Sequence, residues 1–185
     1  MFFFSKNNII NFDPVSVESA YFALLHDDLK TAKKIFQSID SPRAKWGSAL
    51  IEILSGYVQL YPTYFEIRNF LEIDLDFFIK NEKIEYLEHI LGSTEILIRI
   101  NQETYKYVAR VMFENKFYKA AREYLEKSKN IFYNDPELHF LYAKYYFKTK
   151  EYNKANFHIE ECLNILPNYY PALNFQKEIS RYLAW

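Results

Sequence analysis

The 185-residue sequence has one cysteine, three glycines and six prolines, and its charges nearly cancel. A single cysteine, Cys162, excludes a disulfide within the chain and says nothing further about the redox compartment. So few glycines and prolines leave little material for the tight turns of a strand-rich fold, which favours helices. With 23 basic and 24 acidic residues, no overall field draws the chain to nucleic acid or to anionic lipid.

Long apolar runs are also missing. No stretch approaches the roughly 18–20 apolar residues of a membrane-spanning helix. The first residues, MFFFSKNNIINF, do not form a secretory signal, because the apolar cluster is too short and Lys6 follows it instead of preceding it. We therefore expect a cytoplasmic protein without a membrane span, for which peripheral association with a membrane or a larger assembly stays open.

Aromatic residues are abundant, with 17 Tyr and 17 Phe in the chain. Lys, Asn and Ile are frequent too, and all of these residues have AT-rich codons. The base composition of the gene is therefore the explanation we prefer for most of the excess. The alternative is that some aromatic side chains are anchors on a binding surface.

Apolar residues recur at helical spacing along most of the chain, and short polar turns separate the segments. Asp13-Pro14 and Ser41-Pro42 are typical helix caps followed by a first-turn proline, and Thr63 with Glu66 is typical of a capping box. Residues 93–101 either form a separate helix capped by Ser93 or extend the helix that follows. The predicted fold class is all-α, with helices at 14–26, 29–39, 43–60, 63–80, 84–92, 102–115, 117–132, 136–149, 151–165 and 169–184.

The sequence matches itself when it is shifted by 34 residues. Where two helices of a hairpin cross closely, one residue at the contact must be small, and larger side chains fill the space around it. Alanines at 143 and 155 predict such a crossing, and Cys162 is expected to pack against the next hairpin. The shift places Ala109 on Ala143, Met112 on Tyr146, Ala121 on Ala155, Leu125 on Ile159 and Ser128 on Cys162.

On these residues, 102–135 and 136–169 resemble two consecutive tetratricopeptide repeats, and 170–185 resembles the C-terminal capping helix of that family. The resemblance implies one domain, a right-handed superhelical solenoid of antiparallel helix hairpins. Such a solenoid has a concave groove lined by the first helix of each hairpin, which holds an extended peptide or a helix of a partner protein.

The N-terminal half resembles the family less closely. Residues 13–46 form a degenerate repeat that keeps Ala20 and Ala32 but has Ile39 at a small-residue position. Residues 47–101 are predicted to be irregular helices, because their 55 positions are not a multiple of 34. Within them, Leu75 and Leu87 stand where alanines belong, so this hairpin is expected to pack differently.

No arrangement of residues typical of catalysis is found. The histidines, His26, His89, His139 and His158, are scattered, and His158 with Cys162 supplies only two ligands, so we expect no metal and no cofactor. The acidic run Glu72, Asp74 and Asp76 is interpreted as a solvated face. We therefore predict that the protein is not an enzyme and has no small-molecule substrate.

Nucleic-acid binding is a remote alternative. The best basic clusters, Lys33-Lys34 and Arg43 with Lys45, are balanced by acidic residues elsewhere. Helical repeats that read RNA need a recurring pair of base-reading residues, and no such pair recurs in this sequence.

The favoured function is therefore a non-catalytic protein-interaction module, acting as an adaptor, scaffold or chaperone. In the groove implied by the resemblance, Arg110 replaces the asparagine of the family's carboxylate clamp, so that clamp is not implied. The predicted site is a basic, aromatic-floored channel for a segment with acidic residues, made by Lys106, Arg110, Phe113, Phe140, Lys144, Phe147 and Lys148.

Two alternatives stay open at this point. In the first alternative, the lysines and phenylalanines of the predicted channel form the binding site. In the second, the lysines are merely solvated and the phenylalanines pack between repeats. Likewise, the chain is a structural subunit that uses its outer surfaces to join an assembly or to self-associate, or it is an adaptor.

Overall fold

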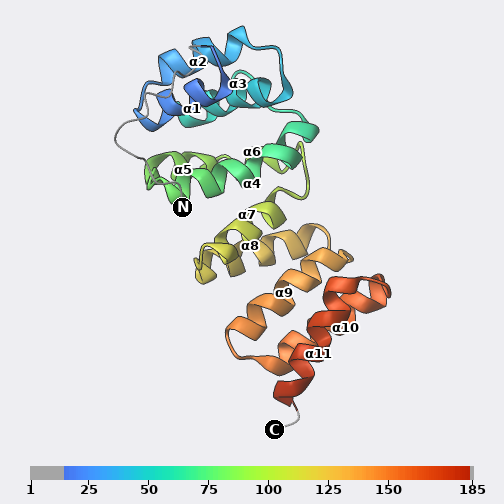
Figure 1. Ribbon diagram of the computed structural model, residues 1–185. Coiled ribbons are helices and arrows are strands. Elements are labelled where there is room, and N and C mark those ends of the chain that lie inside the picture. Colours follow the sequence, from blue (N-terminus) through green and yellow to red (C-terminus); the bar gives the residue numbers. More distant parts are fainter. Residues whose placement is uncertain (1–14, 184–185) are drawn as a thin grey trace.

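The computed structural model describes residues 15–183, and within that range every regular element is a helix. Figure 1 shows the helices stacked one after another into an elongated array, from α1–α3 at one end to α11 at the other. The predicted all-α fold is confirmed. The helices are α1 Val17–Leu25, α2 Leu29–Ser38, α3 Pro42–Leu54, α4 Tyr64–Lys80, α5 Ile84–Gly92, α6 Thr94–Leu97, α7 Thr104–Glu114, α8 Tyr118–Ile131, α9 Pro136–Lys148, α10 Tyr152–Ile165 and α11 Tyr170–Leu183.

Antiparallel hairpins join α1 to α2, α4 to α5, α7 to α8 and α9 to α10. Their turns share one geometry, in which a non-glycine residue takes the left-handed conformation that commonly ends a helix. The φ angles are 61° at Asp27, 57° at Glu82, 67° at Lys116 and 64° at Lys150. Because Glu82, Lys116 and Lys150 are 34 residues apart, the repeat register extends back through the α4–α5 hairpin.

Helix α3 is the extra element that breaks the 34-residue spacing in the N-terminal half. It packs against α2, α4 and α5, and every residue from Trp46 to Leu54 is buried. Gly47 permits the close approach to α2, because a Cβ atom there would lie 2.5 Å from the ring of Phe36. Together with the loop that follows it, α3 accounts for the wider spacing between the first two hairpin turns.

The predicted helix 43–60 is wrong at its C-terminal end, because the helix stops at Leu54. Gly56 turns the chain with a φ of 72°, a conformation that suits glycine. The Glu52 carboxylate then accepts the backbone N–H groups of Gln59 and Leu60, at 2.7 and 3.3 Å. These bonds satisfy the loop backbone outside a helix and hold the loop against α3.

The predicted caps at Ser41-Pro42 and at Thr63 with Glu66 are confirmed. The one at Asp13-Pro14 lies outside the described residues, and the first described helix is capped by Ser16. The open alternative at 93–101 resolves as a separate short helix, α6. Within residues 15–183, no helix is both long and apolar enough to cross a membrane.

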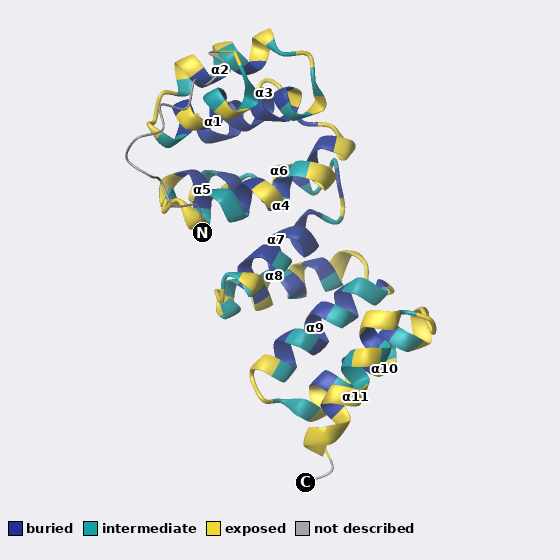
Figure 2. Cartoon of the chain, viewed as in Figure 1, coloured by how far each residue is buried: buried dark blue, intermediate teal, exposed yellow. Residues whose placement is uncertain are grey.

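Buried residues run through the whole stack of helices (Figure 2), and they include the predicted small residues. The alanines at 20, 32, 109, 121, 143 and 155 and Cys162 are at most 1% exposed. Leu75 and Leu87, which replace alanines in the α4–α5 hairpin, are buried as well, and α5 also packs against α3. Two apolar cores result, and α7 contributes Val108 to the N-terminal one and Ala109 to the C-terminal one.

Candidate functional site: the surface of the first helices

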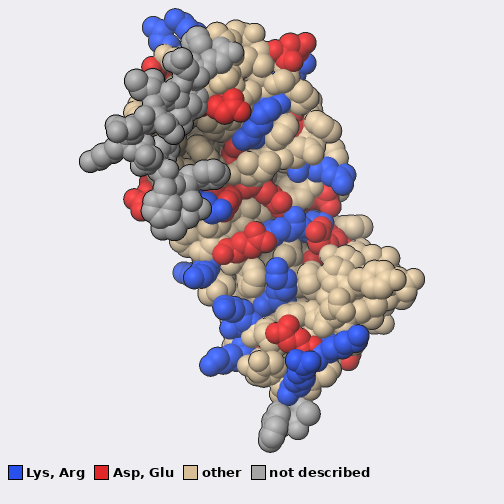
Figure 3. Space-filling view, in the orientation of Figure 1, with Lys and Arg blue, Asp and Glu red and all other residues tan. Residues whose placement is uncertain are grey.

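The first helices of three successive hairpins, α4, α7 and α9, lie side by side, and we call their outward surface the first-helix face. Figure 3 shows acidic and basic side chains alternating across it in the middle of the molecule. The Arg110 guanidinium on α7 donates to Glu72 on α4 at 2.7 Å and to Glu137 on α9 at 2.5 Å. This one cation therefore links the first helices of three hairpins.

Lys106 lies one helical turn before Arg110, and its side chain is only 3% exposed. Its ammonium group donates to Asp135 at 2.5 Å and to Glu103 at 2.8 Å, and it lies 3.1 Å from the Glu137 carboxylate. Burial by itself lowers the pKa of Lys106, but its bonds to Asp135 and Glu103 outweigh burial and raise the pKa. The buried lysine is therefore charged and fully occupied by carboxylates of its own chain.

Carboxylates outnumber cations in this part of the face. Glu72, Glu103, Asp135 and Glu137 surround the two cations described above. Asp135 also caps α9, accepting the N–H of Glu137 at 2.9 Å. The predicted basic character is therefore absent around Lys106 and Arg110, and partner binding by these two residues stays a prediction.

The C-terminal end of the face has a different character. The Lys144 ammonium on α9 lies 5.4 Å from the centre of the Phe113 ring on α7, within the range of a cation–π contact. Lys148 is exposed in the last turn of α9. Neither lysine has a carboxylate partner within the described residues, so this end keeps the basic and aromatic character predicted for the site.

Phe140 and Phe147 are half-buried, and both pack against α11. The Phe140 ring lies 5.5 Å from that of Tyr169 and 5.9 Å from that of Phe175. The Phe147 ring lies 5.1 Å from Phe175 and 5.2 Å from Tyr182. These contacts seat the last helix on the last hairpin, so packing accounts for both rings, and their contact with a partner stays a prediction.

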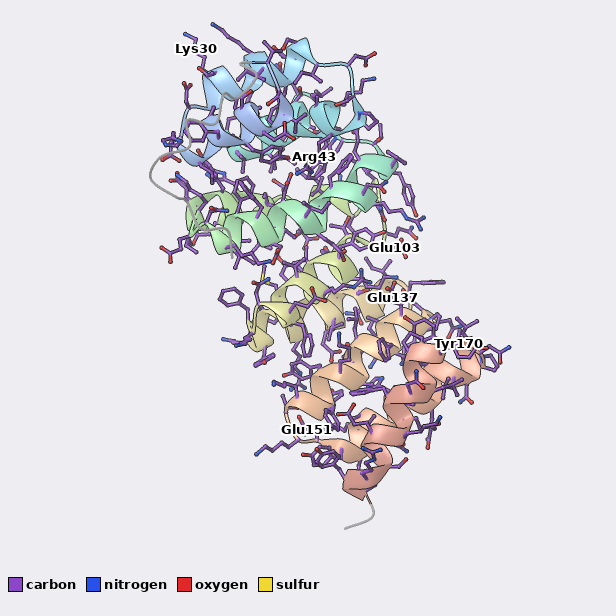
Figure 4. All side chains as sticks on the ribbon, in the orientation of Figure 1. Lys30, Arg43, Glu103, Glu137, Glu151 and Tyr170 are labelled. Atoms are coloured by element: carbon purple, nitrogen blue, oxygen red, sulfur yellow. The ribbon has the colours of Figure 1, made fainter. Side chains whose placement is uncertain are left out.

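The prediction that Asp74 belongs to a solvated acidic face is wrong, because Asp74 is fully buried. Its carboxylate accepts from Tyr21 Oη at 2.7 Å and from Trp46 Nε1 at 2.5 Å, and it pairs with Arg43. Figure 4 places Arg43 where α3 faces α4. The cluster therefore fixes α1, α3 and α4 relative to one another.

The spacing of apolar residues in the sequence does indicate that Asp74 is buried. Asp74 falls on the apolar stripe formed by Leu71, Leu75 and Phe78, at the spacing of one helix face. Arg43, read in the sequence as part of a basic cluster, is the cation that burial of this carboxylate requires.

A histidine pair was also missed. His139 and His158, read in the sequence as scattered, place their Nδ1 atoms 3.0 Å apart inside the last hairpin. His139 Nε2 lies 3.0 Å from the Tyr133 carbonyl oxygen, which can only accept, so His139 carries its proton on Nε2. Its Nδ1 then accepts from the Nδ1–H of His158. Burial lowers the pKa of both residues, and that of His158 falls to about 4.

The geometry of the hairpin explains why His139 and His158 lie together. His139 lies one turn before Ala143, and His158 lies about one turn after Ala155, so the two histidines face each other beside the alanine crossing. Cys162 lies in the same core, where burial raises the pKa of its thiol to about 11. Within the described range, no three His, Cys, Asp or Glu side chains are grouped to hold a metal ion.

No family model matches the chain, and no curated protein matches it. A solved structure described as the crystal structure of the APC/C hetero-tetramer Cut9-Hcn1 is similar with a TM-score of 0.46 and 15% sequence identity. The match covers 88% of this chain, which spans only 42% of the length of that neighbour.

Proposed function

We propose that the chain is a divergent tetratricopeptide-like interaction module, without catalytic activity, that binds a segment of a partner protein across the first-helix face. The single observation that carries the proposal is the double ion pair of Arg110, which joins three hairpins into one continuous surface. The 34-residue spacing of three hairpin turns supports the resemblance to the repeat family. Such arrays typically present an extended surface on which a peptide or a helix lies.

The charges of the face suggest how the work is divided among its residues. Lys106 and Arg110 are engaged by carboxylates, so they hold the helices in place and shape the surface. Lys144 and Lys148 are cations of the face that no carboxylate of the described residues engages, and the Phe113 ring lies beside the first of them. An acidic segment with a large apolar side chain is the ligand that complements this end, since the aromatic contact supplies affinity and the charges supply orientation.

The test uses the intact protein as bait in a pull-down, followed by measurement of affinity for the partner that it captures. Reversing both free lysines, in Lys144→Glu with Lys148→Glu, is expected to weaken that affinity by at least about tenfold. Lys119→Glu is the matched control, because Lys119 is exposed on α8, outside the first-helix face. Equal affinity of wild type and the double variant would place the site elsewhere.

A further inference from the structure

The connections that lead into α4, α7, α9 and α11 all lie along one edge of the array, which we call the loop edge (Figure 1). The hairpin turns lie along the opposite edge. Residues 55–63, 98–103, 132–135 and 166–169 make these connections, in that order along the edge.

The loop edge is unusually apolar. More than half of the large apolar side chains that are exposed in residues 15–183 lie in these connections or in the helix turns next to them. No charged residue occurs at positions 53–65 or 162–176, which supply its two ends. Figure 3 shows the second end as a broad uncharged area, and Figure 4 places Tyr170 at its tip. Six examples, Tyr57, Tyr61, Phe65, Phe132, Leu166 and Tyr170, are between 43% and 74% exposed.

The middle of the edge carries charges of both signs around a cavity of about 430 Å³. Tyr64, Ile100 and Phe132 supply its apolar walls. Arg99 is exposed on the side of the 98–103 connection, and Asp135 belongs to the 132–135 connection. Glu103 ends the 98–103 connection, whereas Asp135 and, on the following helix, Glu137 belong to the other side. All three carboxylates share the single ammonium group of Lys106, so negative charge is in excess behind the cavity, with two of the three carboxylates on the Asp135 side.

We propose that the loop edge binds a second copy of this chain in a twofold-symmetric dimer. A twofold interface must be complementary to itself, so each feature needs its counterpart at the symmetry-related position. An axis through the cavity exchanges the 98–103 and 132–135 connections, which brings Arg99 of one copy to the acidic side of the other. The same axis brings the uncharged end at 55–65 onto the uncharged end at 166–170.

Other occupants fit this edge less well. A partner of one sign would leave either Arg99 or the acidic side of the cavity unpaired, and burying an unpaired charge is costly. The loop edge adjoins the first-helix face at Glu103 and Asp135. The residues changed to test the dimer, Arg99 and Tyr170, are different from the two lysines changed to test the partner site, so the two tests fail separately. The ends of the edge are rich in Tyr and Phe and lack charged residues, which is also the usual composition at the centre of a protein interface.

The test is sedimentation velocity of the intact chain over about 1–100 µM, where a concentration-dependent monomer–dimer equilibrium is expected. Arg99→Glu places like charges together across the axis, and Tyr170→Glu places a charge in the uncharged end. Each is expected to raise the dimer dissociation constant at least about tenfold. Lys119→Glu and Phe117→Glu are the matched controls, at an exposed lysine of α8 and at an exposed aromatic beside the α7–α8 turn, and neither should change it.

Circular dichroism of each variant confirms that the helices are retained. A wild-type chain that stays monomeric across the whole range would overturn the proposal. So would a dimer that survives both loop-edge variants. A monomer that sediments with phosphatidylcholine vesicles, and that loses this property in Tyr170→Glu, would assign the edge to a lipid surface instead and equally overturn it.

Discussion

The buried histidine pair predicts a specific acid sensitivity of the last hairpin. Burial is the main reason why His158 has a lowered pKa, and the neighbouring His139 and Lys129 add to it. A base whose pKa is lower in the folded chain is protonated first in the unfolded chain, so the free energy of unfolding falls as the pH falls from about 6.5 to about 4. The full contribution of His158 to the free energy of unfolding is therefore present above a pH of about 6.5.

The size of the effect follows from the two pKa values. Between an ordinary histidine value of 6.5 and the folded-state value of about 4, the full contribution is about 3 kcal/mol, of which about 2 kcal/mol is lost between pH 7 and pH 5. Geometry gives the same sign for His139, whose pKa is also lowered, because a proton added to its Nδ1 would set two N–H groups against each other across 3.0 Å.

The assay is urea unfolding of wild type and of His158→Gln at both pH values, with free energies from linear extrapolation. Glutamine keeps an N–H donor for His139 but does not titrate in this range. The loss of stability on acidification should therefore be smaller in the variant by about 2 kcal/mol. His26→Gln, at an exposed histidine, controls for removal of an imidazole as such. If wild type and His158→Gln lose the same free energy between the two pH values, the pair does not titrate as described.

Three further changes test the packing. Ala155→Leu overfills the fully buried crossing with Ala143 and should cost about 1–3 kcal/mol, and a melting temperature equal to that of wild type would contradict the assigned register. Asp74→Asn leaves the Arg43 guanidinium without its buried counter-charge, so urea unfolding should show a loss of about 3–5 kcal/mol; an unchanged midpoint would mean that water replaces the pair. Removal of residues 170–185 uncovers Phe140 and Phe147, so size-exclusion chromatography should show aggregates, whereas a soluble monomer would show that α11 is dispensable.

Much of the fold could be predicted because local rules dominate it. Apolar spacing located the helices, and the alanines at 143 and 155 marked a close crossing that the structure contains. The end of α3 could not be predicted, because it depends on a carboxylate, Glu52, that accepts loop N–H groups seven and eight residues later. Helical periodicity carries no information about such a contact.

The candidate site was harder to predict, for the same physical reason. Charge identity alone does not show whether a lysine meets solvent or its own carboxylates, and this distinguishes Lys148 from Lys106. Glu103 lies just before α7, but the other partners of Lys106 are Asp135 in the connection before α9 and Glu137 on α9, which reach α7 only after the hairpins stack. Pairing of distant segments, as at Asp74 and Arg43, is likewise a property of the assembled array.

The location of α3 has a consequence for how the molecule opens. In a regular array each hairpin contacts only its neighbours, so either end can fray. Helix α3 is buried along most of its length and touches α2, α4 and α5, so losing the first hairpin would strip it of much of its cover. We expect α1 to α5 to exchange their amide hydrogens as one cooperative unit, whereas α10 and α11 open locally at lower cost. The N-terminal end of the array therefore unfolds only as a whole, whereas the C-terminal end undergoes local unfolding.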